Sequence, residues 1–436
     1  MAGIQIDQHH YLDNNGNNGA DGIVYGDGYP QEDYFLVRKI YAPVQIQADH
    51  LNFIPGQKSN FTIDVTNRFD FISLHGYQLK WQIVNLKKTL DQGKRWLDAP
   101  ANHTQKVTIQ GWLPEHLTAA QPLALHLMVL DPQGKQINEK NIVLKEADFT
   151  KQIRDIKAIQ DLQISVSKTA VLEIQNKKQW LLKSPLLMRV GRKQTITLQA
   201  QTGKNKFNWQ PYLLRPKVDH FKKIKTDSGQ VYLLDCHWAA DNDSLNHRGF
   251  KGVVQILIRK NNVIELSYKA QPYKGATGSL LECGLTLLLE KQYHTFDYLG
   301  QGPFSTTVGK KAFNENRLWA LDIQDIRFNG NRSNVRLAAA TSTDSTGIGL
   351  WSSNGNIGLE NINGSMAISQ NEIVSGYGSK FKTPKGLMRA SETNEVSGKL
   401  ILFITTASKP VDFLNQTFTP YRTINPENPY QSSYGW

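Results

Sequence analysis

The sequence predicts a mainly β protein with more than one domain, and three observations support this. The chain has 436 residues, which at roughly 150 residues per domain corresponds to about three domains. Its composition, 39% hydrophobic, 10% aromatic and 20% charged, is that of ordinary globular proteins. Apolar and polar residues alternate with a period of two from Val44 to about Lys145, which is typical of half-buried strands, and further candidate strands follow. We therefore expect antiparallel sheets and few helices.

Residues 1–43 differ from the rest and are typical of a β/α unit. A polar loop rich in Asn and Gly leads into the short apolar run Ile23–Tyr25. Side chains then recur at helical spacing over residues 31–41, and Pro43 ends this predicted helix. One strand and one helix make only a fragment of a β/α unit.

Residues 44–147 show the clearest strand pattern. Turn signals at Asn67, at Asp91–Gly93 and at Asp131–Gly134 separate the predicted strands. About seven short strands in about a hundred residues, without a cysteine pair, predict an immunoglobulin-like β-sandwich. The residues expected to face its core are Phe61, Ile63 and Val65; Leu79, Trp81 and Ile83; and Leu123, Leu125, Leu127 and Val129.

A polar stretch, residues 148–160, is predicted to be a linker with a helical turn. Residues 161–436 contain one candidate strand after another, which predicts a large antiparallel double-layered sandwich. Its clearest hairpin is centred on Asn261 and Asn262, which can both take the positive φ of a type I′ turn. The segment from Asn415, rich in Asn, Pro, Tyr and Ser, is expected to be a coil tail.

Charge and cysteine content exclude several classes of function. Lys and Arg number 50 against 38 Asp and Glu, a net charge of +12, but the positive residues are spread over many segments. The densest stretch, Arg215–Lys225, comes without a nucleic-acid fold motif, so we expect a solvated basic surface and no nucleic-acid partner. Cys236 and Cys283 are too few for a four-thiolate zinc site or a disulfide scaffold.

Nothing in the sequence predicts a membrane partner or export. No apolar run approaches the roughly 20 residues of a membrane helix. The first residues, MAGIQIDQHH, lack the basic and apolar regions of a signal peptide, so the chain as written is expected to be cytoplasmic. If the chain is a fragment of an exported protein, its signal would lie on the missing part.

Three sets of residues resemble one known family, the β-galactosidases of glycoside hydrolase family 2. The first set looks like the last strand, loop and helix of the family's catalytic barrel. The second is similar to the start of the immunoglobulin-like domain that follows the barrel. The third is similar to the Gly-Leu and Gly-x-Gly-Pro patterns of the family's β-supersandwich. The sets are Asp7-Gln8 with Asp21–Tyr25 and Lys39–Val44; Asn60–Val84; and Gly284–Leu287 with Phe296–Pro303.

The resemblance implies the C-terminal half of such an enzyme. Residues 1–43 would be the remnant of the last β/α unit of a TIM barrel, residues 44–147 the immunoglobulin-like domain, and residues 161–436 the small-chain β-supersandwich. The family's catalytic glutamates lie on barrel strands that precede this chain, so no catalytic residue is expected. Family members often use Mg or Na ions near the barrel site, and no cofactor is expected in this chain.

The resemblance also implies one candidate substrate-binding residue, Asp21. In the family the corresponding loop lies beside the galactose pocket, where Asp21 would accept a hydrogen bond from a sugar hydroxyl. The alternative is an Asx turn before Gly22. The sequence departs from the family where an acidic and aromatic stretch is expected after Gly-x-Gly-Pro, since Phe304–Val308 stands there instead.

Other candidate sites have simpler structural interpretations. His9 and His10 would point to opposite faces of an extended segment, so we expect loop residues rather than a metal site. Cys236 beside His237 imitates a nucleophile pair, but consecutive strand residues diverge, and Cys236 is expected to be a small core residue. Four Asn-Glu pairs match the context of the family's acid/base residue, yet each is expected in an exposed polar turn: Asn138-Glu139, Asn314-Glu315, Asn371-Glu372 and Asn394-Glu395.

Aromatic residues in the C-terminal region raise a second class of function. Planar rings exposed on a sheet can stack on sugar rings, whereas most such rings are expected in the core. The candidates are Trp180, Trp209, Trp238, Trp319 and Trp351, with Tyr212 and Tyr298.

These observations lead to one expected function and two alternatives. The chain is expected to be the C-terminal or small-subunit-like portion of a family 2 β-galactosidase. It would support hydrolysis of terminal β-galactosides only with a catalytic barrel subunit or fragment as partner, and would be inactive alone. The first alternative is a stand-alone carbohydrate-binding or structural β-sandwich protein without catalysis, and the second is a truncated gene product.

Overall fold

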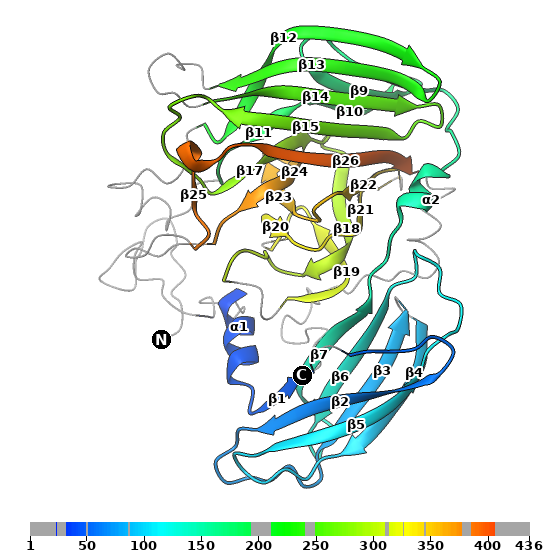
Figure 1. Cartoon of the computed structure of the whole chain (residues 1–436), viewed down its shortest axis with the longest axis vertical. Helices are drawn as coiled ribbons and strands as arrows, with labels where there is room; N and C mark the ends of the chain where they lie inside the picture. The colour runs from blue at the N-terminus through cyan, green and yellow to red at the C-terminus, as the bar shows by residue number, and fades with distance from the viewer. Residues whose placement is uncertain are drawn as a thin grey trace. The chain divides into compact units, whose positions relative to one another are not determined.

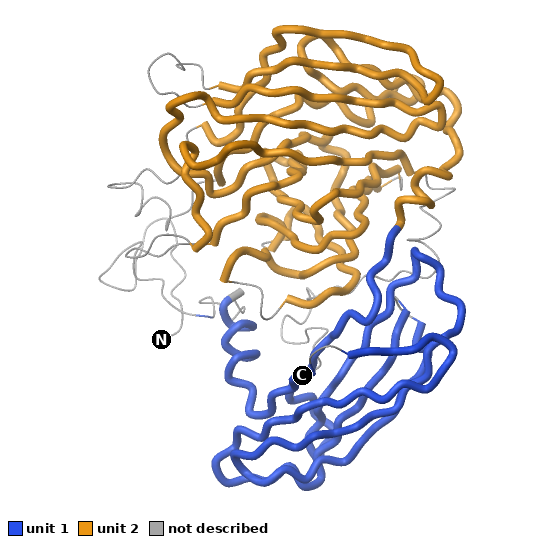
Figure 2. Tube along the Cα trace, viewed as in Figure 1, with its two compact units in different colours: residues 1–148, 421–436 blue, residues 149–420 orange. Residues whose placement is uncertain are grey.

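Strands dominate the computed structural model of the chain, and the predicted mainly β fold class is confirmed. The described residues fall into two compact units, one ending at Asp148 and the other beginning at Phe149 (Figure 2). The structure describes residues 23, 32–48, 51–85, 88–192, 211–239, 249–309, 314–325, 327–343, 346–376 and 385–405.

The first unit contains two antiparallel sheets, with strand orders β1-β2-β5 and β4-β3-β6-β7 (Figure 1). The alternating pattern of the sequence places three of these strands correctly, β2, β3 and β6. Their bounds are β1 Val44–Gln47, β2 Lys58–Asn67, β3 Gln78–Asn85, β4 Lys88–Trp96, β5 Thr104–Trp112, β6 Leu123–Leu130 and β7 Gln136–Lys145.

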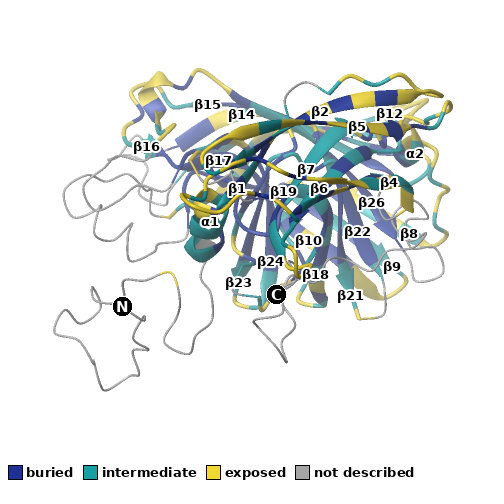
Figure 3. Ribbon diagram, turned by 90° about the horizontal axis from the view of Figure 1, so that it is seen from below, coloured by how far each residue is buried: buried dark blue, intermediate teal, exposed yellow. Residues whose placement is uncertain are grey.

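The two sheets share one apolar core. All ten side chains predicted to face it are buried and belong to a single cluster, and Figure 3 shows buried and exposed residues alternating along β2. Fully burying an apolar side chain of this size stabilises a fold by roughly 1.5–3 kcal/mol. The unit therefore rests on apolar burial, as its lack of cysteines requires.

One turn predicted in this unit is wrong. Asp91–Gly93 lie inside β4, where Gly93 pairs with Trp81 of β3. A Cβ atom on Gly93 would lie 2.7 Å from the Trp81 ring, so glycine is needed for the close approach of the indole. The turn at Asp131–Gly134 is present, with the Gly134 N–H donating to the Asp131 carbonyl over 2.9 Å.

The described part of the chain contains two α-helices, one before β1 and one after β7. α1, Glu32–Tyr41, confirms the helix predicted at residues 31–41, and its last carbonyls are bound by side chains, including Arg68 at 2.8 Å from the Ile40 oxygen. α2, Thr150–Arg154, is the helical turn predicted between the two β regions. Neither helix has the length and apolar character needed to cross a membrane.

The second unit is built on one large antiparallel sheet. Its strand order is β19-β18-β21-β22-β26-β15-β14-β13-β12-β11-β17-β24-β23-β20. Sheets of more than about ten strands curl, and here β17 and β24 lie against β26, which gives two layers. In Figure 1, β12 to β15 and β26 form one curved layer. The bounds are β11 Leu187–Arg189, β12 Leu213–Thr226, β13 Gly229–Ala239, β14 Gly249–Arg259, β15 Ile264–Pro272, β17 Glu282–Leu288, β18 Tyr293–Gly302, β19 Glu315–Asp322, β20 Gly330–Arg332, β21 Leu337–Ser342, β22 Gly347–Ser352, β23 Ile357–Ile362, β24 Ser365–Val374 and β26 Val396–Thr405.

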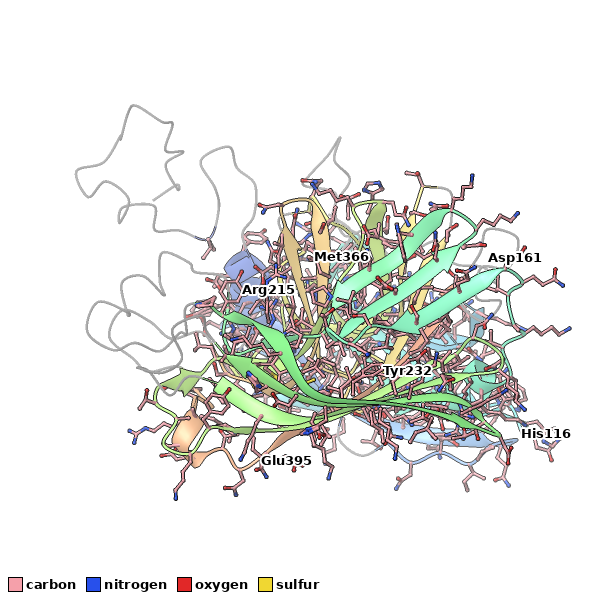
Figure 4. All side chains as sticks on the ribbon, turned by 90° about the horizontal axis from the view of Figure 1, so that it is seen from above. His116, Asp161, Arg215, Tyr232, Met366 and Glu395 are labelled. Carbon is pink, nitrogen blue, oxygen red and sulfur yellow. The ribbon has the colours of Figure 1, made fainter. Side chains whose placement is uncertain are left out.

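Two smaller sheets complete this unit around a single apolar core. Tyr232 of β13 and Met366 of β24, both labelled in Figure 4, are buried in this core. The small sheets have the orders β10-β9-β8 and β16-β25. Their bounds are β8 Leu162–Val166, β9 Val171–Asn176, β10 Gln179–Pro185, β16 Ser279–Leu280 and β25 Met388–Arg389, followed by the 3-10 turn η2, Ala390–Glu392.

The predicted hairpin between β14 and β15 is confirmed, but its turn is not type I′. Asn262 has a φ of 66°, whereas Asn261 is not in the positive region. The Arg259 N–H donates to the Val263 carbonyl across the loop at 2.8 Å. A three-residue loop ending in one left-handed residue replaces the two-residue turn.

Candidate functional site

The structure describes only part of the site residues predicted from the sequence. Asp21, His9 and His10 lie outside the described residues. Cys236 is buried in the core of the second unit, and burial raises the pKa of its thiol to about 12. His237 instead faces Asp219, with its Nδ1 3.1 Å from a carboxylate oxygen. Cys236 is therefore a core residue, as expected, and not a thiolate nucleophile.

Three of the four Asn-Glu pairs were wrongly placed in exposed turns. Both members of Asn138-Glu139 and of Asn314-Glu315 are buried, and in Asn371-Glu372 the asparagine is buried on β24. Only Asn394-Glu395 is exposed. The reason is tertiary: other strands supply the partners, as His126 does for Glu139, with nitrogen and oxygen 2.8 Å apart.

A buried polar face lies on the large sheet, opposite its apolar core. Along β24, Met366 and Ile368 belong to the core, while the alternating residues Ser369 and Asn371 lie on the other face. The same alternation on the neighbouring strands places further polar residues beside them. We call the set the polar face; its members are Arg189 of β11, Glu282 and Thr286 of β17, Glu360 of β23, and Ser369 and Asn371 of β24.

Arg189 is the centre of the polar face. Its Nη2 donates to Glu360 and its Nε donates to Ser369, both over 2.8 Å, and its Nη1 lies 3.7 Å from a Glu282 oxygen. Each of these charged side chains is only 4% exposed. The Arg189 guanidinium thus connects β11 with three further strands, β17, β23 and β24.

A second arginine balances the charge of this cluster. Arg192 Nε donates to the other Glu282 oxygen over 2.7 Å, and its Nη1 donates to the Gly376 carbonyl over 3.0 Å. Two guanidinium groups therefore accompany two carboxylates. Buried ions are tolerated only when they are paired and hydrogen-bonded in this way.

Neutral side chains extend the network and leave one acceptor open. The Thr286 and Ser369 hydroxyls lie 2.7 Å apart, and Asn371 Nδ2 donates to Asn331 over 3.2 Å. Asn371 Oδ1 is buried and has no hydrogen-bond partner within the described part of the chain. A Cβ on Gly358 would lie 2.6 Å from Asn371 Nδ2, so the glycine makes room for this amide.

The polar face reaches solvent at Tyr212, a half-buried residue. Tyr212 donates its hydroxyl hydrogen to Glu360, and its ring centre lies 5.7 Å from the Arg189 guanidinium. Burial raises the pKa of the Tyr212 hydroxyl well above its ordinary value, and Glu360 adds to this shift. Tyr212 therefore remains a neutral donor at any physiological pH.

Sequence reasoning missed the polar face, although a signal was present. Glu282 precedes a run of apolar residues on a strand, and Glu360 lies within another apolar strand. Strands that are buried on both faces have nearly continuous apolar sequences, so a charge within such a run is expected to need a buried partner. Among the described residues, no group of three or more His, Cys, Asp or Glu side chains is placed to hold a metal ion.

The aromatic residues singled out from the sequence divide into core and surface. Trp238, Trp319 and Tyr298 are buried, and Trp351 is half-buried. Trp180 is 38% exposed. Trp209 lies outside the described residues.

Comparison with known proteins finds no family for this chain. No protein-family model and no curated protein matches it. Similar solved structures include a galactose mutarotase-like protein from Lactobacillus casei (11% identity over 57% of this chain and 99% of that chain, TM-score 0.35). Others are a GalM/aldose epimerase homologue from C. elegans (10%, 58% and 98%, TM-score 0.33) and a galactose 1-epimerase from Lactobacillus acidophilus (8%, 75% and 99%, TM-score 0.26). Scores this low carry no argument about the function of this chain.

The predicted membership of glycoside hydrolase family 2 is wrong, and so is the predicted role as a β-galactosidase subunit. No model of that family and no curated protein matches the chain. The motifs that suggested the family have local structural reasons. Gly302, for example, packs against Tyr298 and Trp319, where a Cβ would lie 2.0 Å from the tyrosine oxygen.

Proposed function

We propose that this chain binds a neutral sugar at the polar face. Sugar hydroxyls both donate and accept hydrogen bonds. The polar face offers partners of both kinds, because carboxylate and amide oxygens accept while guanidinium and amide N–H groups donate.

The observation that carries this proposal is the open acceptor, Asn371 Oδ1, inside an otherwise paired network. A buried polar atom without a partner costs roughly 1–3 kcal/mol. A hydroxyl that donates to it would recover much of this cost. The half-buried Tyr212, which bonds Glu360, is the part of the network nearest to solvent.

The charge balance of the site argues for a neutral ligand. Arg189 and Arg192 offset Glu282 and Glu360. An additional charge on the ligand would be buried without a counterion, which costs several kcal/mol. We therefore favour an uncharged saccharide over a sugar acid or a sugar phosphate.

A purely structural role is the second candidate. It is favoured by the number of polar groups that already pair within the network, such as Arg189 with Glu360 and Ser369. In this case the polar face would only join β11, β17, β23 and β24.

Isothermal titration calorimetry with methyl β-galactoside, methyl β-glucoside and lactose distinguishes these two roles. We expect millimolar or tighter binding by the wild type and at least about tenfold weaker binding by Glu360→Gln, which retains the shape of the side chain. Glu395→Gln, an exposed residue of the same unit, is the matched control. Absence of binding by the wild type, or equal binding by Glu360→Gln, would favour the structural role. Circular dichroism checks that each variant is folded.

Finer features of the fold are also proposals. We propose that residues 44–147 form an immunoglobulin-like β-sandwich, supported by antiparallel sheets of three and four strands around one core. The interpretation of residues 1–43 as a barrel remnant stays a prediction. Helix α1 is the main part of this segment that the structure describes. The cytoplasmic location and the lack of a nucleic-acid partner likewise stay predictions.

A further inference from the structure

Trp180 is exposed because strand β10 contains a bulge. The register of β10 against β9 shifts between Trp180 and Leu182. Leu181 and Leu182 are both buried although they are consecutive, and Trp180 is left 38% exposed. Bulges commonly redirect a side chain near a functional site. The bulge therefore turns a large aromatic residue outward while both leucines stay in the core.

The backbone at Trp180 is held by side chains from a distant loop. Gln292 Nε2 donates to the Trp180 carbonyl over 3.3 Å, and Gln179 Nε2 donates to Gln292 Oε1 over 3.1 Å. The Tyr293 hydroxyl donates to the Leu181 carbonyl over 2.9 Å. The backbone that carries the indole is therefore held in place by side-chain hydrogen bonds.

One side of the indole is occupied by a positioned lysine. Lys183 Nζ lies 4.9 Å from the centre of the Trp180 ring and 3.6 Å from Glu173 of β9. Ser165 of β8 donates to Glu173 over 3.2 Å, and these residues face one another across the three strands. This three-stranded sheet lies beside the labelled Asp161 in Figure 4. Glu173 and Ser165 thus help to hold the Lys183 ammonium group over one face of the Trp180 ring.

We propose that Trp180 is a stacking platform for one pyranose ring of a neutral saccharide. The C–H groups on one face of a pyranose pack well on an indole through dispersion. Because the Lys183 ammonium group lies over one face of the ring, the sugar would stack on the opposite face. The ligand class rests on the proposed function, but the platform is separate from the polar face.

The test compares binding of a β-1,4-linked galactan oligosaccharide by three tryptophan variants of the full chain, measured by calorimetry. We expect Trp180→Ala to weaken binding about tenfold and Trp180→Phe, which retains a flat ring, to weaken it less than about threefold. The matched control is Trp96→Ala. Trp96 is 61% exposed and has Lys94 at 5.7 Å from its ring, but it belongs to the first unit.

Each outcome decides for or against the platform. Equal binding by Trp180→Ala and the wild type, an equal loss in Trp96→Ala, or no saccharide binding by the wild type would overturn it. If Trp180→Ala loses affinity while Glu360→Gln does not, the platform stands and the polar face fails as the binding site. The reverse result overturns the platform and leaves the proposed function intact. Circular dichroism of Trp180→Ala and Trp180→Phe checks that each variant is folded.

Discussion

Arg189 and Asp297 are both ionisable residues that are largely shielded from solvent, but they differ in how well their charges are compensated. Arg189 has a hydrogen-bonding partner for each branch of its guanidinium, so its charge is compensated. Asp297, on β18, pairs across the strands with Ala320 and Ala339, and its Oδ1 has no partner within the described part of the chain. Burial alone raises the pKa of Asp297 to about 6. The two residues should respond differently to substitution.

Replacing Arg189 with methionine should strongly destabilise the fold. Arg189→Met leaves the Glu360 and Glu282 carboxylates buried with fewer partners, and breaking a buried ion pair in this way typically costs about 3–5 kcal/mol. The control is Arg389→Met, because Arg389 and its partner Glu392 are 72% and 62% exposed. An exposed pair contributes at most about 1 kcal/mol. Urea unfolding at pH 7 measures both free energies of unfolding, and equal losses would contradict the prediction.

Asp297→Asn should stabilise the protein at neutral pH but not in acid. The ordinary pKa of Asp is 3.8, so between pH 4 and 6 the unfolded chain loses a proton that folded Asp297 keeps. The folded state then binds more protons, and stability falls as pH rises until both states are ionised above pH 6. Asparagine removes this penalty, which is about 3 kcal/mol at most.

The measurement is urea unfolding of Asp297→Asn and wild type at pH 4 and pH 7. We expect the variant to gain stability relative to the wild type on going from pH 4 to pH 7. Asp227→Asn, at an exposed position in the turn between β12 and β13, should show no such gain. A gain that is the same at both pH values would show that Asp297 does not titrate as described.

At the scale of secondary-structure elements, strands were predictable and turns were less so. Strand periodicity is a local property of the chain, and the predicted inward residues such as Leu79 and Leu127 are buried. Glycine signals are ambiguous: Gly134 lies in a turn, whereas Gly93 lies inside a strand under Trp81. Only the neighbouring strand decides between these two uses of a glycine.

The β14–β15 hairpin should depend on Asn262 for two reasons. Its φ of 66° is unfavourable for residues other than Gly, Asn and Asp, and its Nδ2 donates to the Ile159 carbonyl over 2.8 Å. Asn262→Ala loses both advantages and should destabilise the second unit by about 2 kcal/mol. Asn262→Gly relieves the backbone but loses the hydrogen bond, so its cost should be about half. Thermal unfolding of both variants checks this order, and a greater loss for the glycine variant would contradict it.

At the scale of the whole chain, two separate apolar cores predict two unfolding transitions. Leu79 belongs to the core of the first unit and Leu266 to that of the second, and both are fully buried. Removing a buried leucine side chain costs about 2–5 kcal/mol. Leu79→Ala should lower one calorimetric transition and Leu266→Ala the other. A single transition shifted equally by both substitutions would show that the units unfold together.

The family assignment failed at this scale because it rested on short segments. Patterns such as Gly300–Pro303 satisfy local packing needs, since Gly300 lies against the Val335 backbone and Gly302 against Tyr298. A few such positions can arise in unrelated sheets. The polar face, by contrast, is formed by residues of four strands, β11, β17, β23 and β24, that are spread over the second unit's sequence.

The sequence by itself determined that this chain is mainly β, where most of its strands lie and which side of each strand is apolar. These properties follow from period-two alternation, which is local. Only the tertiary structure decided which polar residues are buried and what they contact. Arg189 and Glu360 are 171 positions apart and meet because the strand order β11-β17-β24-β23 brings them onto one face. Pairing between distant strands is set by the packing of the whole sheet, so no local pattern encodes it.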